Sequence, residues 1–245
     1  MTSDRASRPL LAVRPPETRA MVTADGARLD ADIWRPEGRG DYPVLLMRQI
    51  YGRRIGCSIC YAHPSWYAAH GYVVVVQDSR GRGSSEGRFR FGESDAADGA
   101  AAVDWAAGLD GTTGVVGMYG FSYQGYNQLM AAPGAGPALK ALAPSMFAWD
   151  VRHHWAYENG AFHFGGNLGW AVQVAAETAR HAGDGAAFAE LRAASRGLPL
   201  NEAIACRPEL MQRHRDLTHY NTWLDTPATD GYWREVSPAA RIAAI

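Results

Sequence analysis

Hydrophobic and polar positions along the first 150 residues follow two periods, one typical of strands and one of helices. Strands are expected over residues 29–34, 43–47, 72–76, 115–120 and 139–144. Helices are expected over residues 64–70, 94–108 and 123–132. The first strand alternates apolar and polar residues, whereas 72–76 is a run of valines after a tyrosine, as in a strand covered on both faces. Strands and helices that alternate in this way predict an α/β fold with a mostly parallel sheet.

The pattern changes from about Phe147. Valine-rich runs disappear, and the chain becomes rich in alanine, tryptophan and histidine with helical spacing, as in 170–180 and 184–194. We expect an all-helical insertion over one end of the sheet. The predicted organisation is a flexible leader over residues 1–20, an α/β core over 21–147 and a helical cap over 148–245.

Composition narrows the function classes. The 245 residues are 47% hydrophobic and 20% charged, with a formal net charge of −1, which points away from nucleic acid and from an anionic membrane surface. No apolar run resembles a signal peptide or reaches the ~20 residues of a membrane span, so we expect a cytoplasmic protein. Cys57 and Cys60 form a lone C-x-x-C, which we interpret as reduced thiols; His63 and His70 nearby leave a metal site open.

The strongest chemical signal is the hexapeptide Gly120-Phe-Ser-Tyr-Gln-Gly125 between a predicted strand and a predicted helix. It places Ser122 between two glycines in a G-x-S-x-x-G pattern, one residue longer than the G-x-S-x-G nucleophile elbow. The pattern is that of a strained turn that exposes a nucleophilic hydroxyl, since small residues on either side let strand and helix pack closely. The same turn directs the Tyr123 N–H toward a developing oxyanion. The alternative is a tight turn whose serine merely caps the helix.

Four stretches in a fixed order extend this signal over about residues 22–170. They are Asp25-Gly26-x-x-Leu29 with Trp34-Arg35-Pro36, Tyr51-Gly52-Arg53, the segment 77–87 (QDSRGRGSSEG), and the segment 116–125 (VGMYGFSYQG), followed by Leu142-Ala-Pro-Ser145. With them the chain resembles the cocaine esterase and X-Pro dipeptidyl-peptidase family of α/β-hydrolases (CocE/NonD type, S15-like).

The resemblance implies roles for individual residues. Ser122 corresponds to the acylating nucleophile, and Tyr51 to a tyrosine whose hydroxyl supplements the Tyr123 N–H in the oxyanion hole. Trp155 and Trp170 correspond to aromatic positions that line the acyl pocket. Without the resemblance, Tyr51 is an ordinary half-buried tyrosine and the tryptophans are plain core.

The loop after the valine-rich strand begins with two charged residues, for which we expect a structural role. Asp78 and Arg80 are expected to brace this loop through a charge-assisted pair rather than to touch substrate.

A serine hydroxyl also needs a base and an orienting carboxylate, which in this fold follow the serine in the chain. The resemblance implies that both lie beyond the helical insertion, on strands next to residues 139–144. We therefore expect a core without its last strands, a C-terminally truncated family member. The histidines after Ser122 fall in the predicted cap: His153, His154, His163, His181, His214 and His219. His163, between two phenylalanines, is the most suggestive of them as a substitute base.

Three hypotheses follow. The first is a serine hydrolase of acyl esters or X-Pro peptides, inactive or weak as this truncated chain. The second is an enzyme completed in trans by a second chain that supplies the acid, the histidine and the last strands. The third is a non-catalytic binding protein that reuses the fold. The expected ligand is a small-molecule ester or a short peptide, and the inherited chemistry needs no cofactor or metal.

Overall fold

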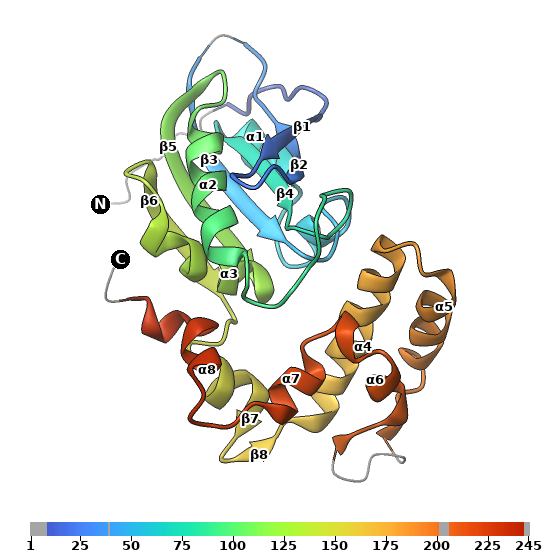
Figure 1. The fold of residues 1–245 in the computed structure, drawn as a ribbon. Coiled ribbons are helices and arrows are strands. Elements are labelled where there is room, and N and C mark those ends of the chain that lie inside the picture. The colour runs from blue at the N-terminus through green and yellow to red at the C-terminus, as the bar shows by residue number, and fades with distance from the viewer. Residues whose placement is uncertain (1–8, 39, 201–205, 243–245) are drawn as a thin grey trace, which may run out of the picture.

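The computed structural model describes residues 9–38, 40–200 and 206–242. Within these residues, six strands form one sheet in the order β1-β2-β4-β3-β5-β6, with helices on both faces (Figure 1). The strands are β1 (Glu17–Val22), β2 (Arg28–Trp34), β3 (Tyr42–Gln49), β4 (Val73–Asp78), β5 (Thr112–Phe121) and β6 (Leu139–Ser145). The helices that accompany them are α1 (Pro64–Ala69), α2 (Asp95–Ala107) and α3 (Tyr123–Ala131). The predicted α/β fold is confirmed.

Strand β4 shows how the valine-rich run is used. All six of its residues are buried. Val73 and Val75 pack in the hydrophobic cluster that contains residues of α2, whereas Val74 and Val76 pack in the cluster that contains Ala68 of α1. Because successive side chains of a strand point to opposite faces, this run fills the layers on both sides of the sheet.

The direction of the strands locates the candidate site. Strands β4, β3, β5 and β6 are parallel, and β1 and β2 join the sheet antiparallel at one edge. The carboxyl ends of the parallel strands therefore meet at one end of the sheet, where ligands bind in open α/β sheets. At the other edge, β6 pairs with β5 alone among the described strands.

The boundary of the expected leader needs a correction. Strand β1 starts at Glu17 and pairs with β2 from Glu17↔Ile33 to Val22↔Arg28, so part of the segment 1–20 belongs to the sheet. Val13 also forms a bridge with Pro36. Only Met21 of this edge strand is buried, so its sequence lacks the apolar alternation that would have announced a strand.

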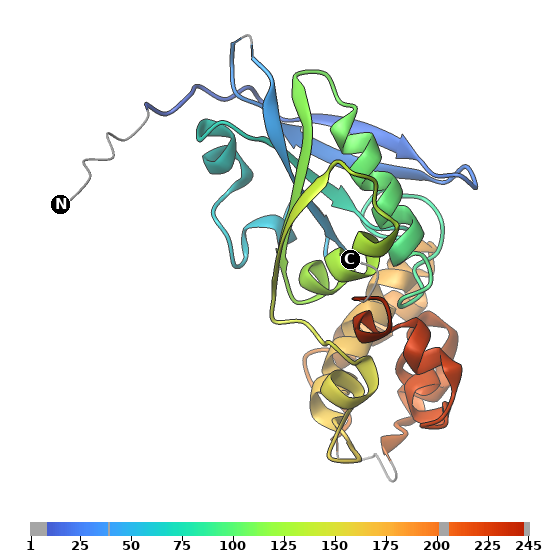
Figure 2. The ribbon, with the colours of Figure 1, turned by 90° about the vertical axis from the view of Figure 1, so that its left-hand side faces the viewer.

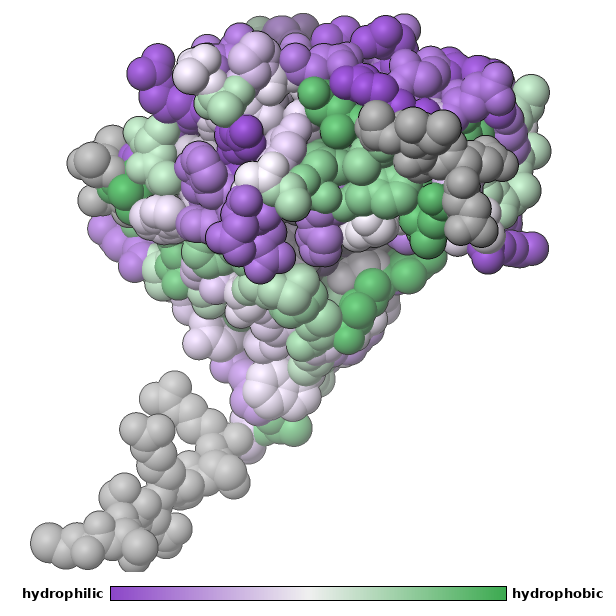
Figure 3. All heavy atoms as spheres, turned by 90° about the horizontal axis from the view of Figure 1, so that it is seen from below, coloured by the Kyte–Doolittle hydropathy of each residue, from purple (hydrophilic) through white to green (hydrophobic). Residues whose placement is uncertain are grey.

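The segment from residue 148 onward lies at one end of the sheet and covers the region below it (Figures 1 and 2). Its helices are α4 (Phe164–His181), α5 (Gly185–Ala194), α6 (Glu209–Arg213), α7 (Tyr220–Asp225) and α8 (Gly231–Glu235). We call the described residues 148–200 and 206–242 the cap. Seen from below, its surface has a band of hydrophobic residues beside a hydrophilic rim (Figure 3). None of the helices in the described residues combines the length and the apolar character that a membrane crossing requires.

The sequence predicted an all-helical cap, but the cap also contains two short strands. Strands β7 (Tyr157–Glu158) and β8 (Ala161–Phe162) form a two-stranded hairpin. Asn159 and Gly160 between them have φ of 50° and 86°. Positive φ at both central residues is the requirement of a two-residue hairpin turn, for which Asn-Gly is the preferred pair. The signal was therefore present in the sequence, in a stretch interpreted by composition alone.

Candidate functional site

Ser122 occupies a sharp turn between the end of β5 and the start of α3. Its φ of 60° and ψ of −124° place a non-glycine residue in a conformation that L-residues rarely adopt. The glycines around it are sterically required. A Cβ on Gly120 would lie 2.4 Å from the Cβ of Gln124, and one on Gly125 would lie 2.8 Å from the Ser145 carbonyl oxygen. A strand, a tight turn and a helix thus follow one another here, as the hexapeptide predicted.

Backbone hydrogen bonds hold this turn in place. The Ser122 N–H donates to the Ser145 carbonyl oxygen at the end of β6 (2.9 Å). The Ser122 carbonyl oxygen accepts from the N–H groups of Gly125 (2.8 Å) and Tyr126 (2.9 Å). The Tyr123 N–H opens α3, and a first-turn donor of a helix has no acceptor within the helix. Its role as an oxyanion donor stays a prediction.

Tyr51 lies just beyond the end of β3, and the structure brings it to Ser122. Burial raises the pKa of the Tyr51 hydroxyl, and the nearby side chains of Ser122 and Trp170 partly offset this. The residue is 39% exposed. Since its pKa is raised, the hydroxyl is protonated at neutral pH and available as a donor.

Trp155 and Trp170 are also brought together. Their ring centroids are 4.9 Å apart, and they lie 6.4 Å and 6.2 Å from the ring of Tyr123. Trp155 stands on a π-helical turn, Arg152–Ala156, a distortion that is frequent at functional sites.

Three further aromatic residues complete this cluster and were not predicted from the sequence. Phe91, from the loop before α2, lies 5.4 Å from Trp155; Trp223 of α7 lies 5.8 Å from it. His219, next to α7, lies 4.5 Å from Trp170. The only sequence signal was the spacing of His219 and Trp223, four residues apart on one helical face. We call Phe91, Trp155, Trp170, His219 and Trp223, with Phe89, the aromatic junction, because the cluster joins core and cap.

The histidines do not form a base for Ser122 in the described part of the chain, where no hydrogen bond joins a histidine to this serine. His163, the most suggestive candidate from sequence, is exposed. His219 is the histidine of the aromatic junction; its Nδ1 lies 3.2 Å from the Thr218 hydroxyl and its Nε2 has no hydrogen-bond partner. Burial, with a smaller effect from the charge of Arg82, lowers the pKa of His219 to about 3, so its ring is neutral at physiological pH.

Asp78 and Arg80 brace their loop, but not by pairing with each other. Asp78 accepts from the Arg53 Nη1 (2.6 Å) and the Arg53 N–H (2.6 Å), while Arg80 forms ion pairs with Asp25 (2.8 Å) and Asp98 (2.8 Å).

Asp32 joins this set through the Arg53 Nε, at 2.9 Å. We call the set the paired network: Asp25, Asp32, Arg53, Asp78, Arg80 and Asp98.

Two other sequence features lie apart from Ser122. Cys57 is buried and Cys60 exposed, and both are free thiols. No group of three or more potential metal ligands occurs among the residues that the structure describes.

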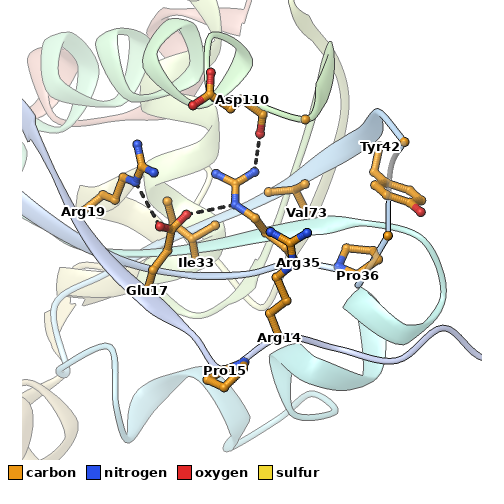
Figure 4. A pocket seen from close by; sticks show the side chains of 13 residues that line it. Arg14, Pro15, Glu17, Arg19, Ile33, Arg35, Pro36, Tyr42, Val73 and Asp110 are labelled. Atoms are coloured by element: carbon orange, nitrogen blue, oxygen red, sulfur yellow. Dashed lines mark hydrogen bonds and ion pairs between the residues drawn. The ribbon is translucent and has the colours of Figure 1, made fainter.

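A separate groove of about 350 Å³ runs along β1 and the amino ends of β3 and β4, at the opposite end of the sheet from Ser122 (Figure 4). There Glu17 lies between Arg19 (3.2 Å) and Arg35 (3.0 Å), and Arg35 also donates to the Asp110 carbonyl oxygen. These contacts hold Glu17 and Arg35 in place, although the Arg35 Nη2 is buried and has no hydrogen-bond partner among the described residues.

Comparisons with known proteins decide the family. The family model described as X-Pro dipeptidyl-peptidase (S15 family) matches residues 25–245. The chain belongs to this family. The cocaine esterase of Rhodococcus sp. (strain MB1 Bresler) is 37% identical to it over 153 residues, which are 61% of this chain and 27% of the esterase.

Solved structures of S15-type and related hydrolases agree in fold. A CocE/NonD family hydrolase from Staphylococcus aureus superimposes with a TM-score of 0.66 at 18% identity, covering 93% of this chain and 38% of that one. An aminopeptidase from a Thaumarchaeota archaeon gives 0.64 at 22% identity, covering 93% and 41%. The S15-family chain described here thus spans less than half the length of the relatives that it matches.

Proposed function

We propose that this S15-family chain carries the acylation site of a serine hydrolase that acts on esters or short peptides, with Ser122 as the nucleophile. The observation that supports this most directly is the strained turn of Ser122, with φ of 60°, at the carboxyl end of a parallel strand. Strain of this kind persists where the surroundings impose it, and it clusters at active sites.

The described residues offer a group for each step of acylation except the base. The Ser122 hydroxyl oxygen attacks the carbonyl carbon, the carbonyl π electrons move onto oxygen, and the Ser122 proton passes to a base. Tyr51 and the Tyr123 N–H donate to the oxyanion, an interaction that gains strength as charge develops. Collapse of the tetrahedral intermediate expels the protonated alcohol or amine and leaves the acyl-enzyme. The aromatic junction is suited to hold an apolar part of the substrate in a water-poor environment.

The base is the part of the proposal that the described residues do not supply. Since no described histidine contacts Ser122, we predict only weak turnover of p-nitrophenyl esters by these 245 residues alone. Serine hydrolases that lose a triad member keep roughly 10³–10⁴-fold catalysis over water from binding and the oxyanion hole. Two alternatives remain as proposals: completion by a second chain that brings the acid and the histidine, and a non-catalytic protein that binds esters.

Covalent labelling tests the assignment without requiring turnover. We expect a fluorophosphonate probe to modify Ser122, located by peptide mass spectrometry, and Ser122→Ala to abolish the modification. Ser195→Ala is the control, because the Ser195 hydroxyl lies on the exposed end of α5 and donates only to the Arg192 carbonyl oxygen (2.8 Å). Labelling that persists in Ser122→Ala would refute the nucleophile assignment. Rapid turnover dependent on Ser122 would instead refute the prediction of weak activity and place a base within these residues.

A further inference from the structure

Arg82 is fixed at the boundary between core and cap, close to the candidate site. Its residue is 1% exposed. The Nη1 donates to the Val174 carbonyl oxygen of α4 (3.2 Å), and the guanidinium carbon lies 3.9 Å from the centre of the Phe89 ring. Trp170 precedes Val174 by one helical turn, so both lie on the same face of α4. Arg82 is therefore attached to the same helical face that brings Trp170 to Tyr51.

Arg82 differs from the other arginines of its neighbourhood in having no carboxylate. Arg53 and Arg80 form ion pairs with aspartates, whereas no ion pair involves Arg82 in the described part of the chain. Burial lowers the pKa of Arg82 to about 10, and Glu177 on α4 only partly opposes this, so the side chain remains a cation at neutral pH. An enclosed cation without a counter-ion is costly, and it usually persists where an anion is to be bound.

The unpaired atoms of Arg82 have a specific geometry. Nε and Nη2 are buried and have no hydrogen-bond partner among the described residues. These two nitrogens form one edge of the planar guanidinium, the edge that binds both oxygens of a carboxylate in a two-pronged arrangement.

Two more buried nitrogen atoms without partners lie in the same region. Trp170 Nε1 and His219 Nε2 are buried and lack hydrogen-bond partners among the described residues, and their rings are 4.5 Å apart. Buried polar atoms without partners are uncommon in folded proteins, and several together indicate a place for a polar ligand or an ordered water.

A groove of about 520 Å³ borders the aromatic junction. It is lined by Phe89, Phe91 and His219 of the junction, and Phe89 is the ring that contacts the Arg82 guanidinium. Four arginines (Arg88, Arg90, Arg215 and Arg241) and three acidic residues (Glu93, Asp216 and Glu235) also line the groove, which leaves a small excess of positive charge.

We propose that Arg82 is the recognition residue for a carboxylate on the substrate, so that the preferred esters or amides carry a free acid group beside the bond that Ser122 attacks. This inference rests on the proposed function, because it takes the bound carboxylate to be part of a substrate that Ser122 attacks. The acid oxygens accept from Nε and Nη2 of Arg82, and the aromatic junction holds the carbon chain between the acid and the reacting carbonyl. The acid belongs either to the acyl part or to the leaving group.

Matched probes test this by binding, independently of turnover. The first pair is the mono-4-nitroanilide of glutaric acid and its primary carboxamide, with the acid on the acyl side. The second pair is 4-(butanoylamino)benzoate and the corresponding benzamide, with the acid on the leaving-group side. Dissociation constants are measured by calorimetry and by tryptophan fluorescence on the full chain. We expect the carboxylate of one pair to bind about tenfold to a hundredfold more tightly than its carboxamide.

The variants identify the residue responsible. Arg82→Met is expected to bind both members of the pair alike, and Arg82→Lys to keep part of the preference because the charge remains. Arg180→Met is the control: Arg180 lies on the same helix but is half-exposed and paired with Glu177 (2.5 Å), so its loss should leave the preference unchanged. Circular dichroism establishes that each variant is folded.

The outcomes separate this inference from the proposed function. Equal binding of acid and amide in both pairs, in a chain whose Ser122 is labelled by fluorophosphonate, overturns the role of Arg82 and leaves the hydrolase proposal standing. A preference that persists in Arg82→Met also overturns it, since another residue then binds the acid. A preference lost in Arg82→Met, in a chain that fluorophosphonate does not label, supports the anion site and rejects the nucleophile.

Discussion

The paired network and the aromatic junction both bury charged or polar groups around the same loop, and they do so in opposite ways. In the paired network, Arg53 and Arg80 each bond to two carboxylates. In the aromatic junction, Trp170 and His219 keep nitrogen atoms without hydrogen-bond partners among the described residues, as does Arg82 beside it. Only Gly81 separates Arg80 from Arg82 in the sequence. The comparison indicates that this loop is stabilised by the first region and adapted for a ligand by the second.

The largest expected effect is on the free energy of unfolding, which should respond differently to the loss of an arginine in each region. Arg53→Met should destabilise the fold by about 3–5 kcal/mol, because it leaves the buried carboxylates of Asp32 and Asp78 without their cation. Arg82→Met should leave the free energy of unfolding unchanged or raise it, because it removes a buried charge that has no carboxylate partner in the described residues. Urea unfolding measures both.

A third variant controls for loss of charge as such. Glu93→Gln alters an exposed pair with Arg90 (3.5 Å), for which we expect a change of at most about 0.5 kcal/mol. If Arg82→Met proves as damaging as Arg53→Met, the distinction between the regions is lost.

A second effect concerns the pH dependence of stability. With a pKa of about 3 in the fold, against 6.5 for the ordinary group, His219 binds a proton in the unfolded chain at pH values where the folded chain does not. Stability therefore rises with pH across this window and falls as pH drops from about 6.5 toward 3. Between pH 7 and pH 4 the contribution is about 3 kcal/mol.

Between pH 7 and pH 4, the free energy of unfolding of His219→Phe should fall by about 3 kcal/mol less than that of the wild type. Urea unfolding at each pH measures this difference. His153→Gln, which removes an exposed histidine, is the control and should follow the wild type. Parallel curves for His219→Phe and wild type would show that His219 titrates normally and is not enclosed.

The smallest expected effect is on the rate at which Ser122 is labelled. Tyr51→Phe removes one proposed oxyanion donor, and we expect fluorophosphonate labelling of Ser122 to slow by about 10²-fold. The fold should be unchanged, since the aromatic ring remains. An unchanged labelling rate would mean that the Tyr51 hydroxyl does not reach the oxyanion.

The sequence predicted the parts of the structure that depend on local patterns. The turn at Ser122 was predictable because its steric demands fall on Gly120 and Gly125, within three residues of the serine. The valine-rich strand was predictable because burial on both faces leaves no polar position. Strand β1 was missed because a single buried residue, Met21, gives no periodicity.

The aromatic junction could not be predicted in the same way. Phe91 and Trp223 are separated by more than a hundred residues, and their 5.1 Å approach depends on how the cap packs against the core. Likewise, nothing in the run 79–87 distinguishes Arg80 from Arg82, because the partners that make one paired and the other unpaired come from distant elements. The hairpin at Asn159 and Gly160 is different: its signal was local and was overlooked.

The hydrogen bond from the Ser122 N–H to the Ser145 carbonyl oxygen makes β6 a mechanical support of the nucleophile. Gly125 reinforces the link, because its Cα packs against the backbone of Ser145 with no room for a side chain. In the described residues the outer edge of β6 is unpaired, so its backbone groups are available to an added strand. A polypeptide that pairs with this edge would shift β6, and with it the Ser145 carbonyl oxygen that accepts from Ser122. Assembly at the sheet edge would therefore change the orientation of the Ser122 side chain.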